Sequence, residues 1–331
     1  MLYSAKTYDS AKHASKYAVN IPEVSFDLPK IIARKSKVVR KLVLGVKAKL
    51  TANNVTIVSG EAQIIDKNTV RCGEETYEGE NLILCTGSET FIPPIPGVDA
   101  VNYWTHRDAL DSKELPASLA IVGGGVIGME FASFFNSLGV QVTVVEMMDE
   151  ILGGMDKELS ALLRAEYTKR GIKFLLSTKV VGLSQTEEGA VVSYENAEGN
   201  GSVIAEKLLM SVGRRPVAKG FGLENLNLEK TERGAIRINE KMQTSVPGVY
   251  VCGDLTGFSL LAHTAVREAE VAVHSILGKE DAMSYRAIPG VVYTNPEIAG
   301  GGETEESAST KGINYQAVSY THLTLPTKLE V

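Results

Sequence analysis

The sequence predicts an α/β protein with more than one domain. Residues 119–146 alternate a strand, a helix and a second strand, and short apolar runs typical of strands lie on both sides of this unit. The chain has 331 residues and a mass of 35.6 kDa, which is enough for two domains with sizeable cores. Hydrophobic residues make up 44% and charged residues 22%, so the composition excludes a disordered or fibrous chain.

Charge and hydropathy exclude several kinds of partner. With 34 Lys and Arg against 40 Asp and Glu, the net charge is −6, which gives no electrostatic basis for binding nucleic acid or an anionic membrane. The longest apolar stretch, residues 119–135, contains three adjacent glycines and Glu130, so no transmembrane segment is predicted. Residues 1–20 show no apolar core of a signal peptide.

The cysteines predict neither a metal site nor a disulfide. Cys72, Cys85 and Cys252 have no metal-ligand or CxxC spacing, and this sparse, odd set favours a reducing, cytoplasmic compartment. Cys85 and Cys252 stand at the ends of expected strands and Cys72 on a hairpin strand, so all three are interpreted as structural residues. Cys252 also lies in a distant segment, which argues against a redox pair.

Helices and short strands are predicted for the N-terminal third. Apolar and small residues repeat at helical spacing through residues 2–11 with no strand before them, and because domains of this class usually begin with a strand, we expect that an N-terminal part is missing. A second helix is predicted over residues 27–50, with Pro29 in its first turn, where the missing N–H costs nothing. Strands are predicted at residues 55–66, 69–72 and 81–85.

The order of elements changes after a Pro- and Gly-rich segment at residues 93–97, and we place a domain boundary between it and Pro116. Beyond the boundary, the pattern predicts a strand, a helix and a strand at residues 119–122, 126–138 and 141–146, then a helix at 156–170. Further strands are predicted at residues 172–176, 180–185, 190–194, 203–212, 235–238 and 249–252, and a helix at 261–277.

A glycine-rich turn joins the first strand of the central unit to its helix. The run Gly123-Gly-Gly-Val-Ile-Gly128 fits the GxGxxG pattern: Gly123 permits the tight turn, Gly125 lets backbone approach a pyrophosphate, and Gly128 lets the helix pack on the strand. The N-terminus of the helix offers unpaired N–H groups to the phosphates. The motif predicts a dinucleotide site, and the alternative is a glycine-rich turn without a ligand.

Glu146 gives the predicted site its specificity. It ends the second strand, 23 positions after Gly123, where a carboxylate can accept both ribose hydroxyls of an adenosine. A carboxylate repels a 2′-phosphate, so the sequence predicts NAD rather than NADP. The residues predicted at this site are Gly123, Gly124, Gly125, Val126, Ile127, Gly128, Met129, Glu130 and Glu146.

Further short motifs identify a family when they are taken together. They are Leu84-Cys-Thr-Gly-Ser88, Ser211-Val-Gly-Arg-Arg-Pro216, Val249-Tyr-Val-Cys-Gly-Asp254, Leu260-Leu-Ala-His263 and Tyr293-Thr-Asn-Pro-Glu-Ile-Ala299. With the GxGxxG segment, they make residues 1–317 resemble the dihydrolipoamide dehydrogenases, which are flavin-dependent pyridine nucleotide-disulfide oxidoreductases. Each short motif alone is weak, whereas the combination is highly specific.

The resemblance implies a Rossmann-like NAD-binding domain inserted in an incomplete FAD-binding domain with an antiparallel β-meander, followed by the start of an α+β interface domain. The expected division is a partial FAD-binding domain at 1–116, the NAD-binding domain at 117–240, the rest of the FAD-binding domain at 241–285, the start of the dimerisation domain at 286–317 and a tail unlike the family at 318–331. The family's first flavin βαβ unit and most of its interface domain have no counterpart, so we expect a family member truncated at both ends. The tail, which contains His322, is interpreted as foreign or frame-shifted.

The resemblance also implies contacts to two cofactors. Asp254 matches the residue that binds the flavin side chain, and a strand-end turn aspartate is the structural alternative. Contacts to FAD are implied for Gly60, Thr86, Gly87, Ser88, Asp254, Leu260, Leu261, Ala262 and His263, and contacts to NAD for Val180 and Gly213. His263 is expected to act through its backbone. Glu130 matches a residue that pairs with a lysine beside the family's redox disulfide, and that lysine has no counterpart in this chain.

The reaction implied by the resemblance is oxidation of a protein-bound dihydrolipoyl group by NAD⁺ through FAD and a redox disulfide. The family's CxxxxC disulfide has no counterpart, so no catalytic residue is assigned and the chain alone is expected to be inactive. The implied partners are a lipoyl-carrying protein of a 2-oxoacid dehydrogenase or glycine cleavage complex, and a second copy of the chain in a homodimer. Two alternatives stay open: another member of the superfamily, such as a mercuric reductase or an NADH oxidase, or a non-catalytic NAD-binding fragment.

Overall fold

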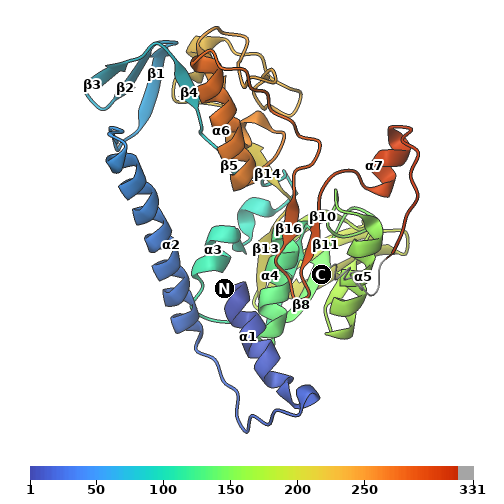
Figure 1. Cartoon of the computed structure of the whole chain (residues 1–331). Helices are drawn as coiled ribbons and strands as arrows, with labels where there is room; N and C mark the ends of the chain where they lie inside the picture. The colour runs from blue at the N-terminus through green and yellow to red at the C-terminus, as the bar shows by residue number, and fades with distance from the viewer. Residues whose placement is uncertain (320–331) are drawn as a thin grey trace, which may run out of the picture.

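The computed structural model describes residues 1–319, which Figure 1 traces from a helical N-terminus through a central sheet to a short C-terminal helix. The tail from residue 320 onward, His322 included, lies outside the described residues. The architecture is mixed α/β, as the sequence predicts, because a parallel sheet forms the middle of the chain and antiparallel sheets flank it. No helix within residues 1–319 is both long enough and apolar enough to cross a membrane.

A parallel five-stranded sheet forms the centre of the molecule, with strand order β6-β13-β7-β8-β9. Its strands are β6 (Tyr103–Trp104), β7 (Ser118–Val122), β8 (Gln141–Val145), β9 (Lys173–Leu175) and β13 (Lys207–Met210). Helix α4 (Val126–Ser137) connects β7 to β8, and α5 (Lys157–Lys169) connects β8 to β9. The strand–helix–strand order predicted for the centre of the chain is confirmed.

Strand β7 packs against a different layer on each of its faces. Because successive side chains of a strand point to opposite sides, Leu119 and Ile121 join an apolar core with α4 and α1 (Leu2–Lys12). Ala120 and Val122 join another core with the antiparallel sheet. That sheet consists of β10 (Lys179–Thr186), β11 (Gly189–Asn196) and β12 (Gly199–Ala205), in this order. Helices therefore cover one face of the central sheet, and strands cover the other.

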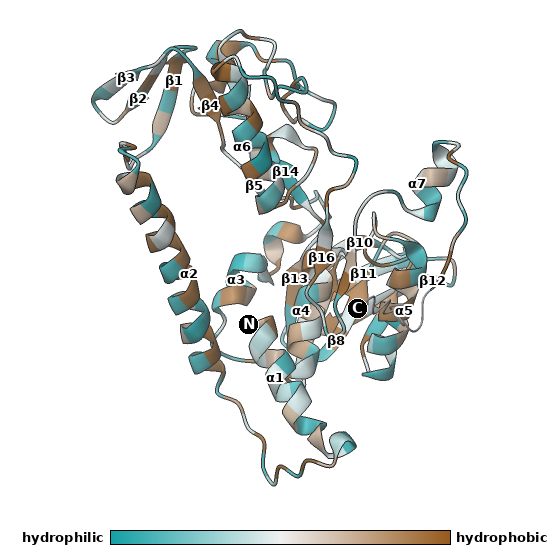
Figure 2. Ribbon diagram, viewed as in Figure 1, coloured by the Kyte–Doolittle hydropathy of each residue, from teal (hydrophilic) through white to brown (hydrophobic). Residues whose placement is uncertain are grey.

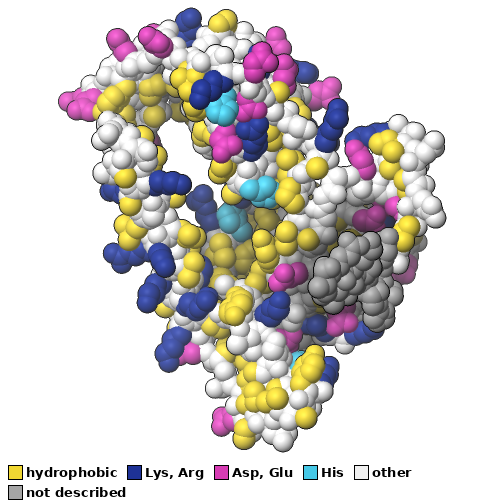
Figure 3. Space-filling model, viewed as in Figure 1, with side chains coloured by type: hydrophobic (Ala, Val, Ile, Leu, Met, Phe, Trp, Pro, Cys, Tyr) yellow, Lys and Arg dark blue, Asp and Glu magenta, His cyan; other side chains and the backbone are white. Residues whose placement is uncertain are grey.

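Helix α2 (Leu28–Ala52) runs along one side of the molecule (Figure 1). Asp27 caps its N-terminus by accepting a 3.0 Å hydrogen bond from the Lys30 amide, and Pro29 lies in the first turn as predicted. Only Leu28 and Ile32 of this helix are buried, although its later turns are rich in apolar residues (Figure 2). The side chains of these apolar residues are exposed on the surface (Figure 3). The exposed apolar residues are Val38, Val39, Leu42, Val43, Leu44, Val46 and Leu50.

A second layered unit lies above the central sheet in Figure 1. In it, β4 (Leu82–Leu84) and β15 (Val249–Val251) pair in parallel, and α6 (Ala262–Ile276) packs on β15 through Val271 and Ala272. The small antiparallel sheets are β1 (Ala62–Asp66) with β2 (Thr69–Cys72) and β3 (Glu75–Glu78), β5 (Ser88–Thr90) with β14 (Arg214–Pro216), and β16 (Gly290–Val292) with β17 (Ile298–Gly300). The remaining helices are α3 (His106–Asp111), α7 (Glu305–Thr310), and the 3-10 helices η1 (Ala14–Tyr17), η2 (Val98–Ala100), η3 (Leu223–Leu226) and η4 (Gly253–Thr256).

The strand predicted over residues 203–212 is in fact two strands, β12 and β13. The chain leaves the antiparallel sheet after β12 and enters the parallel sheet with β13, so the single residue Glu206 must change direction between them. Its carboxylate accepts a 2.7 Å hydrogen bond from the Ala117 amide, which holds this corner beside the start of β7. An apolar run alone does not reveal such a change of sheet.

Two other predicted strands are wrong over part or all of their length. Residues 55–61 form no strand, and β1 begins only at Ala62. Residues 235–238 form no strand because the Ile236 amide donates to the Leu255 carbonyl, and Ile236 makes a single isolated bridge with Lys230. The elements that the sequence did not predict are β3, β5, β6, β14, β16, β17, α3 and α7.

Candidate functional site

The GxGxxG turn lies at the carboxyl end of β7. Gly123 has a φ of +106°, and a Cβ there would lie 2.3 Å from the Ser211 carbonyl oxygen, so only glycine fits. A Cβ on Gly128 would lie 2.1 Å from the Gly123 carbonyl oxygen, so this glycine lets α4 start close against the turn. By contrast, a Cβ on Gly125 would meet no atom of the described residues within 4 Å. The turn therefore presents its backbone to free space at Gly125.

Helix α4 starts directly from this turn. Its N-cap residue, Gly125, has no side chain that could accept hydrogen bonds from the first amides. Val126 is 39% exposed at the helix start, whereas the Met129 side chain is fully buried in the core. The first turn of α4 can thus offer amides to an anion, and the Met129 side chain is out of reach of any ligand there.

Glu146 lies directly beside the glycine turn, after the end of β8. Its carboxylate accepts a 2.5 Å hydrogen bond from the Gly124 amide and a 2.7 Å hydrogen bond from the Met148 amide. The residue is half-buried, and each of its two carboxylate oxygens accepts one of these hydrogen bonds. The two ends of the predicted site, the turn and the acidic residue, are thereby brought into contact.

The loop after β13 closes the other side of the turn. The Ser211 hydroxyl is buried and has no hydrogen-bond partner among the described residues, and Gly213 follows with a φ of +121°. Thr178, two residues before Val180 of β10, donates a 2.9 Å hydrogen bond from its amide to the Glu146 carbonyl. Open space at the turn and an orphaned hydroxyl beside it are what a bound dinucleotide would need to fill and to satisfy.

A second group of predicted site residues gathers at the carboxyl ends of β4 and β15. The Ser88 hydroxyl donates a 2.5 Å hydrogen bond to the Asp254 carboxylate, and Arg214 donates to the Ser88 hydroxyl at 2.7 Å and to the Ser88 carbonyl at 2.6 Å. Thr86 donates to the Val217 carbonyl at 2.8 Å. Arg214 thus ties the segment after β13 to the segment after β4.

Gly87 keeps the backbone of this second group open on one side. It has a φ of +72°, and a Cβ there would meet no described atom within 4 Å. Gly253, with a φ of +75°, precedes Asp254 but is buried, and a Cβ there would approach the Ala265 side chain of α6, at 3.4 Å. A ligand can therefore approach the half-buried Asp254 from the side of Gly87.

The segment from Leu260 to His263 forms the start of α6, with Leu261 at the N-cap. The His263 Nε2 atom lies 2.9 Å from the Pro289 carbonyl, so its imidazole ties the helix start to the chain before β16. Its side chain thus has a structural partner, which matches the expectation that any ligand contact would be made by backbone.

Glu268 is a buried acid that sequence reasoning missed. It lies on the inner face of α6 and is fully buried, where its carboxylate accepts hydrogen bonds from the Gly253 amide at 2.5 Å and the Tyr285 hydroxyl at 2.7 Å. Burial raises the pKa of the Glu268 carboxyl, and these hydrogen bonds oppose the shift. The amphipathic pattern of residues 262–276 places Glu268 among inward-facing positions, and that was the available signal.

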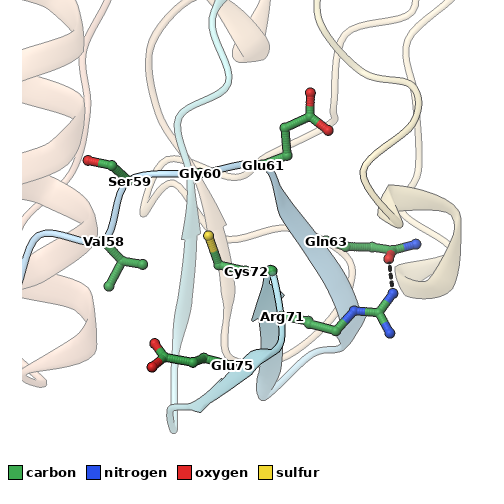
Figure 4. Close-up of a pocket in the computed structure, with 9 residues that line it drawn as sticks. Val58, Ser59, Gly60, Glu61, Gln63, Arg71, Cys72 and Glu75 are labelled. Atoms are coloured by element: carbon green, nitrogen blue, oxygen red, sulfur yellow. Dashed lines mark hydrogen bonds between the residues drawn. The ribbon is translucent and has the colours of Figure 1, made fainter.

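Gly60 lies apart from the other predicted flavin residues in this structure. It precedes β1 and, with Val58, Ser59, Glu61, Gln63, Arg71, Cys72, Gly73 and Glu75, lines a hollow beside the β1–β3 sheet (Figure 4). A Cβ on Gly60 would lie 2.6 Å from the Cys72 sulfur, so a larger residue here would need the Cys72 side chain to move. No hydrogen bond among the described residues joins this hollow directly to Asp254.

Glu130 faces the C-terminal part of the described chain. Its carboxylate accepts a 3.0 Å hydrogen bond from the Tyr293 amide, immediately after β16. Burial raises the pKa of the Glu130 carboxyl, and the Tyr293 hydrogen bond opposes this shift. No lysine pairs with Glu130 within residues 1–319.

The expectation that the cysteines lie apart is wrong for two of them. Strands β4 and β15 pair in parallel with Val251 opposite Leu84, so the following residues, Cys252 and Cys85, are neighbours on adjacent strands. The sequence separation of 167 positions concealed this pairing because strand register depends on the tertiary fold.

Comparisons with known proteins bear on this arrangement. A family model described as pyridine nucleotide-disulphide oxidoreductase matches residues 2–269. The chain belongs to this family. It is 34% identical to the dihydrolipoyl dehydrogenase of Geobacillus stearothermophilus over 97% of the chain and 69% of the relative, and 38% identical to that of Thermus scotoductus over 95% and 68%. It also resembles the Cu(II) complex of the HOCl-induced flavoprotein disulfide reductase RclA from Escherichia coli, with a TM-score of 0.79 and 26% identity over 92% of the chain and 68% of that structure.

Within the pyridine nucleotide-disulphide oxidoreductases, enzymes such as the dihydrolipoyl dehydrogenases use FAD and NAD. The present chain spans about two thirds of the length of these relatives. The two groups of residues described above belong to the same part of the chain that the family model covers. The fold class predicted from the sequence is therefore confirmed at the level of the family.

Proposed function

We propose that this chain binds NAD(H) at the GxGxxG turn and that Glu146 selects NAD over NADP. The observation that carries the proposal is the 2.5 Å hydrogen bond between the Gly124 amide and the Glu146 carboxylate. It puts a negative charge at the edge of the turn, where the ribose of an adenosine has to lie if its pyrophosphate meets the N-terminus of α4. Ribose hydroxyls can donate to this carboxylate, whereas a 2′-phosphate would be repelled.

We propose further that FAD binds at the group around Asp254. The Asp254 carboxylate would accept a hydroxyl of the flavin side chain, with Thr86, Gly87 and Ser88 on one side and the start of α6, Leu260 to His263, on the other. Gly60 would meet the adenine end. When bound, the flavin and the nicotinamide supply the redox chemistry, while the protein groups bind and orient them.

In the whole protein, we propose that these sites serve oxidation of a dihydrolipoyl group by NAD⁺ through FAD and a redox disulfide outside this sequence. The partner would then be a lipoyl-carrying protein, and a second copy of the chain would complete a homodimer. The proposed domain division follows the boundaries 1–116, 117–240, 241–285 and 286–317. Free thiols at Cys72, Cys85 and Cys252 suit a reducing compartment such as the cytoplasm. The resemblance of this chain to dihydrolipoyl dehydrogenases supports the proposed reaction and its lipoyl-carrying partner.

Titration of the chain with NADH and NADPH tests the cofactor preference, with nicotinamide fluorescence as the readout. We expect tighter binding of NADH, and we expect Glu146→Gln to narrow the ratio of the two dissociation constants about tenfold. Asp149→Asn removes the same charge from an exposed position of the same loop, where Asp149 pairs with Lys157, and should leave the ratio unchanged. Equal affinities in the unmodified chain, or an equal response to both substitutions, would overturn the assignment.

A further inference from the structure

Two thiols meet at the ends of adjacent parallel strands. Cys85 follows β4 and Cys252 follows β15, and the Cys252 amide donates a 3.1 Å hydrogen bond to the Leu84 carbonyl. This bond belongs to the last pair of the two strands, Leu84 with Val251, and the next position along both strands places Cys85 opposite Cys252. Side chains at opposed positions of a parallel sheet point to the same face of the sheet.

The distance across such a pair suits a disulfide. Neighbouring strands lie about 4.8 Å apart, and disulfides span Cα separations of about 4.4–6.8 Å. The pair can therefore close with little movement of the backbone, which the hydrogen bonds of β4 and β15 already hold in register. Cys72, the third thiol, lies in another sheet, on β2.

The two thiols differ in access. Cys85 is exposed, whereas Cys252 is only 2% exposed. Interaction with the Cys252 thiol lowers the pKa of the Cys85 thiol to about 7, and interaction with Cys85 together with burial raises the pKa of Cys252. The negative charge of Glu268 acts on both thiols and raises the pKa of each. A thiolate at neutral pH therefore forms on the exposed member of the pair, where a reagent can reach it.

We propose that Cys85 and Cys252 form a reversible disulfide by exchange with a small disulfide such as oxidised glutathione, with Cys85 as the attacking and Cys252 as the resolving thiol. This site is separate from the family's redox disulfide, and it does not depend on the cofactor assignments above. It links the strands that lead into Thr86-Gly-Ser88 and Gly253-Asp254.

The exchange balances in two steps. In the first, the Cys85 thiolate attacks one sulfur of the small disulfide, so that a mixed disulfide forms at Cys85, the original S–S bond breaks and one glutathione thiolate leaves. In the second, Cys252 gives its proton to the leaving thiolate and attacks the Cys85 sulfur, and the second glutathione leaves. Two protein thiols are oxidised to one disulfide, and one small disulfide is reduced to two thiols.

Peptide mapping of the folded chain tests the proposal. The chain is incubated with oxidised glutathione at pH 7, circular dichroism is used to check that it stays folded, and the reaction is stopped by acid and alkylation. We expect the intact mass to fall by two hydrogen atoms, a cross-linked peptide that joins Cys85 to Cys252, and full reversal by a dithiol reductant. The peptide map of the unmodified chain is sufficient to test the proposal. A stable glutathione adduct on Cys85 without a cross-link, or a cross-link to Cys72, would overturn the proposal.

Single substitutions separate the two roles. Cys252→Ser should accumulate the mixed disulfide at Cys85, because the resolving thiol is absent, whereas Cys85→Ser should react neither with the reagent nor internally. Cys72→Ser is the matched control, and it should form the cross-link at the rate of the unmodified chain. Reaction of Cys252 in the Cys85→Ser variant, at the rate seen for the unmodified chain, would reverse the assigned order and contradict the proposal.

Discussion

The Ser88 hydroxyl donates a 2.5 Å hydrogen bond to the Asp254 carboxylate across 166 positions of sequence. Arg214 donates in turn to the Ser88 hydroxyl at 2.7 Å, so a guanidinium, a hydroxyl and a carboxylate form a chain of charge-assisted hydrogen bonds. Three segments that are far apart in the sequence are thereby joined at one point. The joint sets the position of Asp254, which the proposed flavin contact requires.

This joint should contribute measurably to stability. Ser88→Ala and Asp254→Ala each remove one partner of a half-buried hydrogen bond, and each should lower the free energy of unfolding by about 1–2 kcal/mol. Asp254→Asn keeps an acceptor oxygen but loses the charge, so the double variant with Ser88→Ala should show a coupling of about 1 kcal/mol in urea denaturation, because both changes weaken the same charge-assisted interaction. Glu89 follows Ser88 on β5 and forms an exposed ion pair with Arg215, so Glu89→Gln should change the free energy of unfolding by less than about 0.5 kcal/mol. Strictly additive effects of Ser88→Ala and Asp254→Asn would argue against the joint.

Two roles of the glycine turn, the approach of a ligand at Gly125 and the packing of α4 at Gly128, can be separated by adding one methyl group at each position. Gly125→Ala should leave the melting temperature nearly unchanged, because Gly125 has a φ of −70° and a Cβ there meets open space, yet it should weaken NADH binding by blocking the approach of the pyrophosphate. Gly128→Ala should lower the stability by about 1–3 kcal/mol, because its Cβ would overlap the Gly123 carbonyl. Calorimetry and NADH titration on both variants provide the comparison. A Gly125→Ala variant that binds NADH normally would show that the ligand does not pass this glycine.

Glu268 should make stability depend on pH in a defined direction. Burial raises the pKa of its carboxyl in the folded chain above the ordinary value of 4.5, so the folded state holds the proton more tightly than the unfolded state. The resulting contribution to stability is fully present below pH 4.5 and is lost as pH rises through the raised folded pKa. As pH increases, the unmodified chain should therefore lose stability relative to the Glu268→Gln variant.

The neighbouring Glu270, exposed on the same helix and paired with Arg267, provides the control. Glu270→Gln should leave the pH dependence of the melting temperature as it is in the unmodified chain. A flat difference between the unmodified chain and Glu268→Gln from pH 4 to 8, the range that brackets the ordinary value of 4.5, would contradict a raised pKa for this residue.

The chain alone should not oxidise dihydrolipoamide, even with FAD and NAD⁺ added. Such a reaction needs a disulfide beside the flavin and a histidine base held by a carboxylate. The structure does contain a histidine–carboxylate pair, with His274 Nδ1 at 2.7 Å from Asp281, a pair that the sequence did not reveal. However, at 1.5 Å per residue His274 lies about 13 Å along α6 from Ala265, the residue that faces Gly253. NADH formation above a thiol-free control, lost in Cys85→Ser and Cys252→Ser, would show that the thiol pair supports turnover.

Local features of the fold could be predicted from the sequence where a signal is short-ranged. The unit β7–α4–β8 repeats apolar residues with clear periods, and the steric role of Gly128 is local, because a Cβ there would overlap the Gly123 carbonyl of the same unit. The Asp27 cap and Pro29 mark the start of α2 in the same local way. Features that depend on a distant partner could not be predicted: β5 and β14 are only three residues long, and each exists because the other pairs with it.

The same contrast applies to the candidate site. Gly123 and Glu146 could be placed from their spacing, since a parallel strand pair brings their ends to one edge. The contact between Cys85 and Cys252 depends on the register of two strands far apart in the chain, and nothing near either cysteine encodes that register. The prediction of a strand at residues 55–61 was wrong because a local apolar run favours a strand, but no partner strand pairs with these residues.

The position of β13 between β6 and β7 imposes an order on folding. Strand β6 lies at the edge of the parallel sheet and pairs only with β13, which the ribosome makes long after β6 and β7. Until residues 207–210 emerge, β7 keeps one open edge, β6 has no strand partner, and Ser211 is not yet beside Gly123. During synthesis, the antiparallel sheet β10–β12 must therefore be made before the nucleotide turn can close, so the competence of the nascent chain to bind a dinucleotide begins only near residue 213.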